Sequence, residues 1–352
     1  MEKISALWKK YRKKISSAIR KASADFFQFG KRHRYKIAIG AAAICVLAAT
    51  GVVTAKWYIK DRQALVRNAE TTFHFGAIGD FEYGTRNKVG NKLTRQAKTE
   101  LEKVVRFYNT QYDPIFAIEL GDMVESSGQK REKTLQQFRD IDAIFRGIDA
   151  RTEYVLGNHD LRALSKEDVR MVLGLEDNHR YFDEGDWRFV IMDTNFDPKR
   201  DGADMGPNHY VSGYVPPREL DWLEMAITTD RPTVVFSHHP IASHEKNTRN
   251  YKEVRAVFER HPNVALSVSG HEPAFRFSES NGIHYLVVDN LANKDSLGSF
   301  ATLNLFYNPF TKEARAAVEH YGPTRRTVEA KKIISADREW WVDMFDQFGL
   351  LP

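Results

Sequence analysis

The chain has 352 residues, of which 42% are hydrophobic, 12% aromatic and 28% charged. This composition excludes collagen-like, low-complexity and intrinsically disordered chains, and it allows one large domain or two ordinary ones. The single cysteine excludes an intrachain disulfide and any zinc or iron–sulfur site built from cysteines. The net charge of +5 is uneven, because residues 1–36 carry 12 Lys and Arg against two acids and the rest of the chain is mildly acidic. We therefore expect no binding of nucleic acid by the body of the protein.

An apolar segment follows the basic arm of residues 1–36. Residues 37–55 form a run of 19 residues without a charge. As a helix this run spans about 28 Å, close to the roughly 30 Å of a membrane's hydrocarbon core. Trp57 and Tyr58 follow it, where interfacial aromatic residues are found. We predict a single transmembrane helix, an uncleaved signal anchor over residues 37–58. A buried Ala-rich core helix and a signal peptide cleaved before Lys56 are the alternatives.

The charges around this span predict its orientation. The positive-inside rule keeps the basic arm in the cytoplasm, so everything after about residue 59 would lie outside the cytoplasm, anchored in the cell membrane. Apolar residues of the arm follow a helical stripe, and most of its lysines lie off that stripe. This pattern predicts a basic amphipathic helix on anionic lipid; an ordinary solvated charged segment is the alternative. Residues 59–72 are predicted to be a polar linker.

Residues 73–322 are predicted to form one α/β domain, because short β-rich runs alternate with helical patterns. The predicted strands are 73–79, 114–120, 152–156, 188–192, 233–236, 264–268, 284–288 and 301–306. The predicted helices are 93–108, 133–145, 217–227 and 251–260. Residues 323–352 are predicted to be a C-terminal tail of one or two helices.

Polar side chains follow the downstream ends of five predicted strands. Ligands of α/β proteins bind beyond the carboxyl ends of such strands, so we expect these side chains to meet. Carboxylate, amide and imidazole ligands together suit Mn, Fe or Zn, which predicts a metal site. Glycines precede four of the five residues and allow tight turns and close backbone approach. The five residues are Asp80, Asp122, Asn158, His238 and His271. The four glycines are Gly79, Gly121, Gly157 and Gly270.

These segments, in this order, resemble the motifs of the calcineurin-like metallophosphoesterases, including the purple-acid-phosphatase branch. The resemblance covers roughly residues 73–290, and its most specific piece is Gly157-Asn158-His159-Asp160. It implies an α/β sandwich of two mixed β-sheets flanked by helices. It also implies a hydrolase that cleaves phosphate mono- or diesters by means of a metal-activated water, with one or two divalent ions per chain.

The resemblance assigns ligand roles to the five polar residues. Asp122 would bridge two metal ions. Asn158, His238 and His271 would complete the coordination of one ion, and Asp80 would bind the other. Such a pair of ions clamps the attacking and leaving oxygens of a displacement at phosphorus.

Two further residues of the most specific motif receive catalytic roles from the resemblance. His159 would protonate the leaving alkoxide, and Asp160 would orient it. Asp160 is alternatively a helix N-cap. His239 is a weaker candidate that could contact a substrate phosphate or merely pack. His74 lies inside a predicted strand and is expected to be a packed core histidine.

Two departures from the family pattern fall on the same metal position. Glu82 stands where the family has the histidine of D-x-H, and Pro273 stands where it has the second histidine of G-H-x-H. Glu82 can still bind Mn or Fe, but Pro273 cannot. Glu125 occupies the place of a tyrosine found in the purple-acid branch. We therefore predict that this position is carboxylate-rich or impaired. The alternative function is a catalytically weak or inactive binding protein at the membrane.

Overall fold

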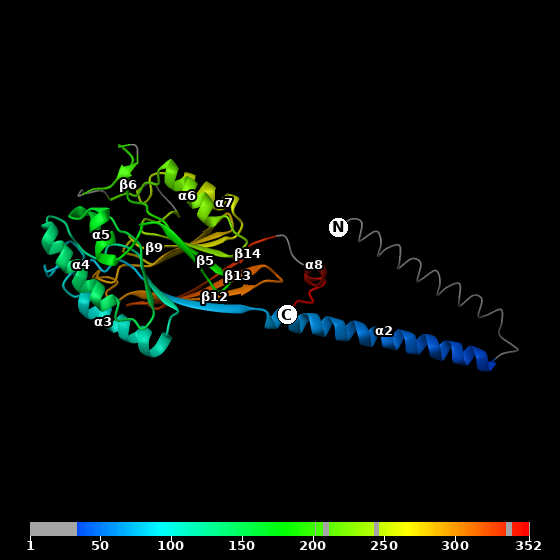
Figure 1. Cartoon of the computed structure of the whole chain (residues 1–352). Helices are drawn as coiled ribbons and strands as arrows, with labels where there is room; N and C mark the ends of the chain where they lie inside the picture. Colours follow the sequence, from blue (N-terminus) through cyan, green and yellow to red (C-terminus); the bar gives the residue numbers. More distant parts are fainter. Residues whose placement is uncertain (1–33, 201, 207–210, 243–245, 336–339, 352) are drawn as a thin grey trace. The chain divides into compact units, whose positions relative to one another are not determined.

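The computed structural model describes residues 34–200, 202–206, 211–242, 246–335 and 340–351 (Figure 1). Its contacts divide the chain into two units, with the boundary between Arg67 and Asn68. The first unit contains the helix α2 (Arg34–Asn68). Residues 1–33 of the predicted amphipathic arm lie outside the described residues. So do the side chains of residues 34–47 and 49–51, which include most of the predicted span. Within the described part of the chain, no helix has the length and apolar character needed to cross a membrane.

The predicted linker, residues 59–72, has regular structure. Its first part belongs to α2, which continues to Asn68, and the first strand already begins at Thr71. Helix-forming residues in the sequence IKDRQALVRN explain why the helix continues past the apolar run.

One six-stranded sheet, sheet 1, has the order β14-β13-β12-β1-β2-β3. β1, β2 and β3 are parallel, so their carboxyl ends lie at the same edge. β12, β13 and β14 extend the sheet by antiparallel pairing. The strands are β1 (Thr71–Ile78), β2 (Phe116–Glu119), β3 (Arg151–Tyr154), β12 (Phe300–Asn308), β13 (Glu313–Tyr321) and β14 (Arg326–Ile333).

The other six-stranded sheet, sheet 2, has the order β10-β11-β9-β8-β5-β4. Its four central strands are parallel, and β4 and β10 close its two edges by antiparallel pairing. Both sheets are mixed, as predicted. The strands are β4 (Arg180–Glu184), β5 (Trp187–Ile191), β8 (Thr233–Ser237), β9 (Val264–Ser269), β10 (Arg276–Ser280) and β11 (Ile283–Val287). A separate two-stranded ribbon pairs β6 (Phe196–Asp197) with β7 (Ala203–Asp204).

The main hydrophobic core lies between the two sheets. Side chains alternate along a strand, so Phe73, Phe75 and Ala77 of β1 all join this core. The ring of Phe75 stacks on that of Phe116 of β2, with 4.8 Å between ring centroids, and meets that of Phe236 of β8 edge-on, with 5.6 Å between centroids. This apolar layer fixes the two sheets against each other and so fixes the relative positions of their strand ends.

Helices cover the outer faces of the sandwich (Figure 1). α3 (Ala97–Phe107), α4 (Arg131–Phe145) and α5 (Lys166–Leu173) share a second core with sheet 1, and a π-helical turn at Tyr108–Tyr112 continues α3. α6 (Pro217–Ile227) and α7 (Tyr251–Arg260) share a third core with sheet 2. On α7 the buried residues are Val254, Val257 and Phe258, whose spacing places them on one face of the helix.

The prediction of a wholly helical tail is wrong for its first part. Arg326–Ile333 forms β14, which pairs with β13 along almost its full length. Val328 and Ala330 pack against the core between the sheets, while their charged neighbours face outward. The many charges of RTVEAKKI conceal this alternation in the sequence. The helix α8 (Trp340–Gln347) follows later in the tail.

Gly76 allows β1 to lie directly under the ring of Tyr108. That ring is fully buried, and its hydroxyl donates a hydrogen bond to the carbonyl oxygen of Ala301 (2.8 Å). A Cβ on Gly76 would lie 2.6 Å from Cε2 of the ring. Gly76→Ala should therefore lower the free energy of unfolding by about 1–3 kcal/mol through overpacking, as denaturant titration will measure. Gly206→Ala, where a Cβ meets nothing within 4 Å, is the control. Equal unfolding free energies for wild type and Gly76→Ala would contradict this account.

Candidate metal centre

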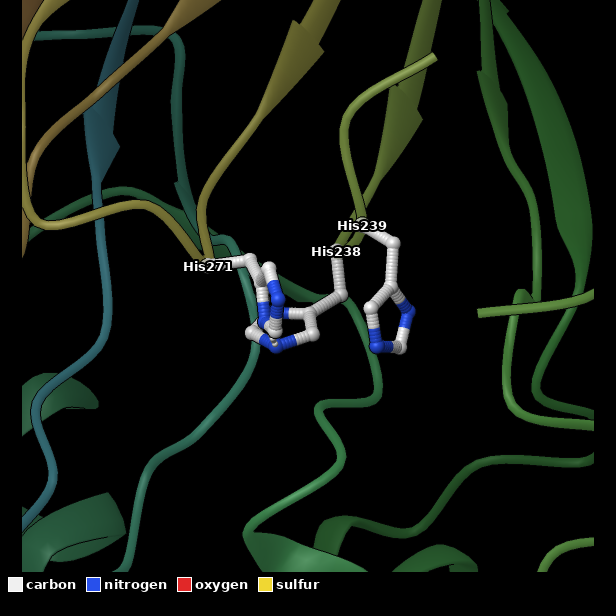
Figure 2. A group of neighbouring side chains, drawn as sticks. All are labelled: His238, His239 and His271. Carbon is white, nitrogen blue, oxygen red and sulfur yellow. Dashed lines mark hydrogen bonds between the residues drawn. The ribbon is translucent and has the colours of Figure 1, made fainter. Parts of the chain in front are cut away.

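The carboxyl ends of parallel strands from both sheets bring the five predicted ligands together. Asp80, Asp122 and His238 offer ligand atoms that all lie within 4.8 Å of one another. Nε2 of His238 lies 3.1 Å from Oδ1 of Asn158 and 3.3 Å from Nδ1 of His271. Figure 2 shows His238 and His271 reaching toward each other from neighbouring chain segments. The structure thus assembles the polar residues that the sequence placed after five separate strands.

His238 is held so that one ring nitrogen faces the cluster. Its Nδ1–H donates to the carbonyl oxygen of Leu120 (2.8 Å), which leaves Nε2 directed toward Asn158 and Asp122. A backbone partner of this kind fixes the tautomer of a metal-binding histidine. Several lone-pair-bearing atoms therefore converge on one point, and their mixture of carboxylate, amide and imidazole fits a divalent ion such as Mn, Fe or Zn.

Glycines allow the loops of the cluster to approach each other closely, as the sequence predicted. A Cβ on Gly157 would overlap the backbone nitrogen and the carboxylate of Asp122, and a Cβ on Gly121 would lie 2.8 Å from Cγ of His238. Positive φ angles also gather here, at Glu82 (48°), Asp122 (64°) and His271 (67°). Non-glycine residues in this region store strain, which is a frequent property of functional sites.

Asp160 does not orient His159, contrary to the sequence prediction. Its buried carboxylate accepts hydrogen bonds from the backbone N–H groups of Asp122, Val124 and Gly157, each at 3.1 Å. Its side chain does not cap the short 3₁₀ helix that it begins. Burial and the negative charge of Asp122 raise the pKa of Asp160 to about 8. Asp160 therefore fixes the loops that carry Asp122 and Asn158.

His159 is oriented by a different carboxylate. Its Nδ1 lies 2.7 Å from Oε2 of Glu125, a residue that is itself buried. Burial alone would raise the pKa of Glu125, but the hydrogen bond with His159, followed by the charges of His159 and Lys92, lowers it below its ordinary value. From the sequence, Glu125 is predicted as the replacement for a tyrosine of the purple-acid branch and as a residue that could fill the open metal position, not as the partner of His159.

Sequence reasoning missed Lys92 altogether. Its ammonium group forms ion pairs with Glu82 and with Glu125 (2.7 Å) and lies 3.0 Å from the ring nitrogens of His159. Burial opposes the charge, yet Glu82 and Glu125 raise the pKa of Lys92 above its ordinary value. Several basic residues share its loop, TRNKVGNKLTR, and no spacing in the sequence singles out the one that points inward.

The backbone N–H of Glu82 donates to the carbonyl oxygen of Asp122 (2.7 Å), but its carboxylate belongs to a different group of side chains. Its ligand atoms group with those of Glu125 and His159, not with those of Asp80 and Asp122. One of its carboxylate oxygens, Oε2, is buried without a hydrogen-bond partner among the described residues. Pro273 contributes no ligand atom to any of these groups.

Another histidine joins the cluster from the residue after His238. His239 is fully buried, its Nδ1 lies 2.7 Å from the hydroxyl of Thr194, and its ring centroid is 4.6 Å from that of His271 (Figure 2). Together His238, His239 and His271 offer three nitrogens within 4.8 Å. By contrast, His74 is only half-buried, and its Nε2 lies 2.9 Å from the carbonyl oxygen of Asp113, so it is not the packed core histidine that we predicted.

Comparison with known families decides what kind of protein this is. The family model for calcineurin-like phosphoesterases matches residues 73–275, more than half of the chain. The chain belongs to this family.

Among curated members of the calcineurin-like phosphoesterase family and its relatives, a 3′,5′-cyclic-nucleotide phosphodiesterase of Nostoc is 25% identical over 177 residues. That match covers 48% of this chain and 61% of the relative's length. A manganese-dependent ADP-ribose/CDP-alcohol diphosphatase of Xenopus tropicalis is 21% identical over 322 residues, covering 72% of this chain and 94% of the relative.

Solved structures share the fold of this calcineurin-like phosphoesterase. A dimetal phosphatase from Danio rerio has a TM-score of 0.58 at 16% identity, covering 73% of this chain and 98% of its own. GAP50, described as the anchor in the inner membrane complex of Plasmodium, has a TM-score of 0.50 at 13% identity. That match covers 80% of this chain and 95% of the GAP50 chain. At such identities these likenesses show the fold alone.

The electrostatics of the cluster predict that metal binding by the free protein releases a proton. Burial acts against the charge of His238, but the carboxylates of Asp122 and Asp80 outweigh it and raise its pKa to about 9. Burial and the neighbouring His238 lower the pKa of His271 to about 3, so this ring is already neutral. His238 must lose its proton before Nε2 can bind a metal ion.

The affinity for Mn²⁺ should therefore rise by up to about tenfold per pH unit between pH 6.5 and 8.5 and level off above pH 9. Calorimetric titration in buffers of different ionisation enthalpy will show the proton released. His238→Gln is the matched variant. It should bind Mn²⁺ more weakly than the wild type and release fewer protons on binding. Binding that is independent of pH over this interval would contradict the loss of a proton from His238 on metal binding.

Proposed function

We propose that this chain is a metal-dependent phosphoesterase that hydrolyses phosphate esters outside the cytoplasm. The observation that carries the proposal is the convergence of Asp122, Asn158 and His238 on one point at the carboxyl edge of the strands. Membership in the calcineurin-like phosphoesterase family supports the same reaction class. The fold alone would not, because one fold can carry unrelated activities.

The residues that would hold a divalent ion are Asp80, Asp122, Asn158, His238 and His271. When bound, the ion supplies a Lewis acid and lowers the pKa of water into the neutral range. Manganese is the metal that we propose first, since the Xenopus relative is named as manganese-dependent and the donor set is of the kind that Mn accepts.

The protein's own groups would then position the substrate and move a proton. His159 is partly accessible at the rim, and Glu125 fixes its ring by accepting from Nδ1–H. We propose that this imidazole donates a proton to the leaving alkoxide, a step that contributes about 10²–10⁴ to the rate of such reactions. Asp160 acts on this step only through the backbone, by fixing the loop that carries His159.

For the substrate we propose a phosphodiester or diphosphate of nucleotide type. The support is the printed activities of the relatives, a cyclic-nucleotide phosphodiesterase and an ADP-ribose/CDP-alcohol diphosphatase. A generic phosphate monoester is the comparison substrate. Since the Nostoc relative is matched over only part of its length, this choice is a starting point for assays with 3′,5′-cyclic AMP, ADP-ribose and p-nitrophenyl phosphate.

A second candidate function is a binding protein at the membrane with little or no catalysis. Pro273 favours it, because this residue removes a ligand from one metal position. The solved structure of GAP50, named as an anchor, belongs to a protein with the same fold. Metal binding without turnover of any phosphate ester would support this candidate over the enzyme.

We also propose that the chain is anchored in the cell membrane by residues 37–58, with its N-terminus in the cytoplasm. The support is the uncharged 19-residue run and the +10 charge of the arm that precedes it. The lipid would be contacted by the span and by the basic arm.

The general-acid role of His159 predicts an effect that depends on the leaving group. His159→Ala in the full-length protein should lower kcat about 10²–10⁴-fold for 3′,5′-cyclic AMP, whose alkoxide needs a proton. The loss should be much smaller for p-nitrophenyl phosphate, because p-nitrophenolate leaves without protonation. His261→Ala is the matched control, since His261 lies before β9, at the edge opposite the site. An equal loss for both substrates would remove the general-acid assignment.

The anchor predicts the location of the C-terminus. A reporter that folds only where disulfides form, fused after Pro352, should be active when it follows the full chain. The same fusion without residues 1–58 should be inactive, because its reporter stays in the cytoplasm. An inactive reporter on the full chain, or a mature N-terminus at Lys56, would overturn the anchor.

A further inference from the structure

Lys92 lies at the centre of a group that would otherwise resemble a metal site. Ligand atoms of Glu82, Glu125 and His159 all lie within 4.8 Å of one another. The ammonium nitrogen of Lys92 contacts all three residues, at 2.7 Å for Glu125 and 3.0 Å for His159. This donor set therefore does not fit a metal ion, because a cation from the chain itself is already bound by it.

The backbone of Lys92 is fixed on both sides. Its N–H and carbonyl oxygen both pair with Val89 at 3.0 Å, which closes a tight hairpin turn at Gly90. The next residue, Leu93, donates to the carbonyl oxygen of Ala292 at 2.7 Å, and this ties the hairpin to the segment after β11. The loop therefore presents the side chain of Lys92 to the acidic group from a defined position.

The charges of the group require a cation. Glu82 and Glu125 are each only 1% exposed, and the bridging candidate Asp122 is buried beside them. Buried carboxylates cost several kcal/mol each unless a positive charge compensates them. Arg162 lies 3.5 Å from the far oxygen of Glu125, so it compensates only one of these carboxylates. Lys92 contacts both glutamates at once.

We propose that the ammonium group of Lys92 replaces the second metal ion, so that this chain is a single-metal member of its family. The one ion binds at Asp80, Asp122, Asn158, His238 and His271. Lys92 is a positioning residue that neutralises Glu82 and Glu125 and fixes His159. The proposal rests on the proposed metal-dependent function. It explains why a glutamate and a proline stand where a second ion would need histidines.

Metal stoichiometry tests this proposal without reference to catalysis. The full-length protein, saturated with Mn²⁺ and desalted, should contain one ion per chain by elemental mass spectrometry, and its paramagnetic resonance spectrum should be that of isolated Mn²⁺. Lys92→Met removes the charge but keeps the length of the side chain. It should bind a second ion at the freed carboxylates, with about two ions per chain and a spectrum broadened by spin coupling.

Two control variants are measured beside Lys92→Met. Lys88→Met changes an exposed lysine of the same loop and should still bind one ion. Lys92→Arg keeps a cation and should also bind one. If Lys92→Met fails to fold by circular dichroism, Lys92→Gln replaces it. Two spin-coupled ions in the wild type would overturn the proposal, and so would a folded Lys92→Met or Lys92→Gln protein that still binds one ion.

The failure of this proposal differs from the failure of the enzyme proposal. Absence of phosphate-ester hydrolysis leaves the ion count unchanged and contradicts only the enzyme. Two ions in an active wild-type protein contradict only the role of Lys92. Absence of any bound ion contradicts both, because the metal centre itself is then missing.

Discussion

The concentration of buried negative charge around Asp122 is the constraint on which the rest of the site depends. Carboxylates from several neighbouring loops are buried within a small volume. Each of them needs a hydrogen bond, a cation or a proton to offset the loss of water. The structure uses all three. Backbone amides bind Asp160, imidazole and ammonium groups lie against Asp122 and Glu125, and burial favours the protonated form of Asp160.

The packing of the two sheets holds these groups at fixed distances. Phe75, Phe116 and Phe236 join the two sheets, and within each sheet the strands that precede the predicted ligands run parallel. Small residues at the turns then allow the loops to come closer than side chains would permit. The strained backbone at Asp122 and His271 is tolerated because the surrounding packing determines it, so the ligand atoms meet without further rearrangement.

Local patterns in the sequence were sufficient to find most of the polar residues that the fold brings together. A β-rich run that ends in glycine and a polar residue identifies both the strand and the side chain at its carboxyl end, as for Asp122 and Asn158. The missing parts depend on contacts between distant segments. Which lysine of a basic loop turns inward is decided by the pairing of Leu93 with Ala292, and β14 is recognisable only from its partner strand. The partner of His159 likewise comes from a segment more than thirty residues away.

Because the hairpin at Gly90 carries Lys92, the cation of this group does not depend on the surrounding solution. A charge carried on the polypeptide is present at an effective concentration on the order of millimolar or more, whatever the composition of the medium. Unlike a bound metal ion, the ammonium charge of Lys92 cannot be lost by dilution, removed by a chelator or exchanged for another metal. With one ion in place of two, as we propose, metal loading would take a single step, and the tolerance of metal scarcity would depend on a single dissociation constant.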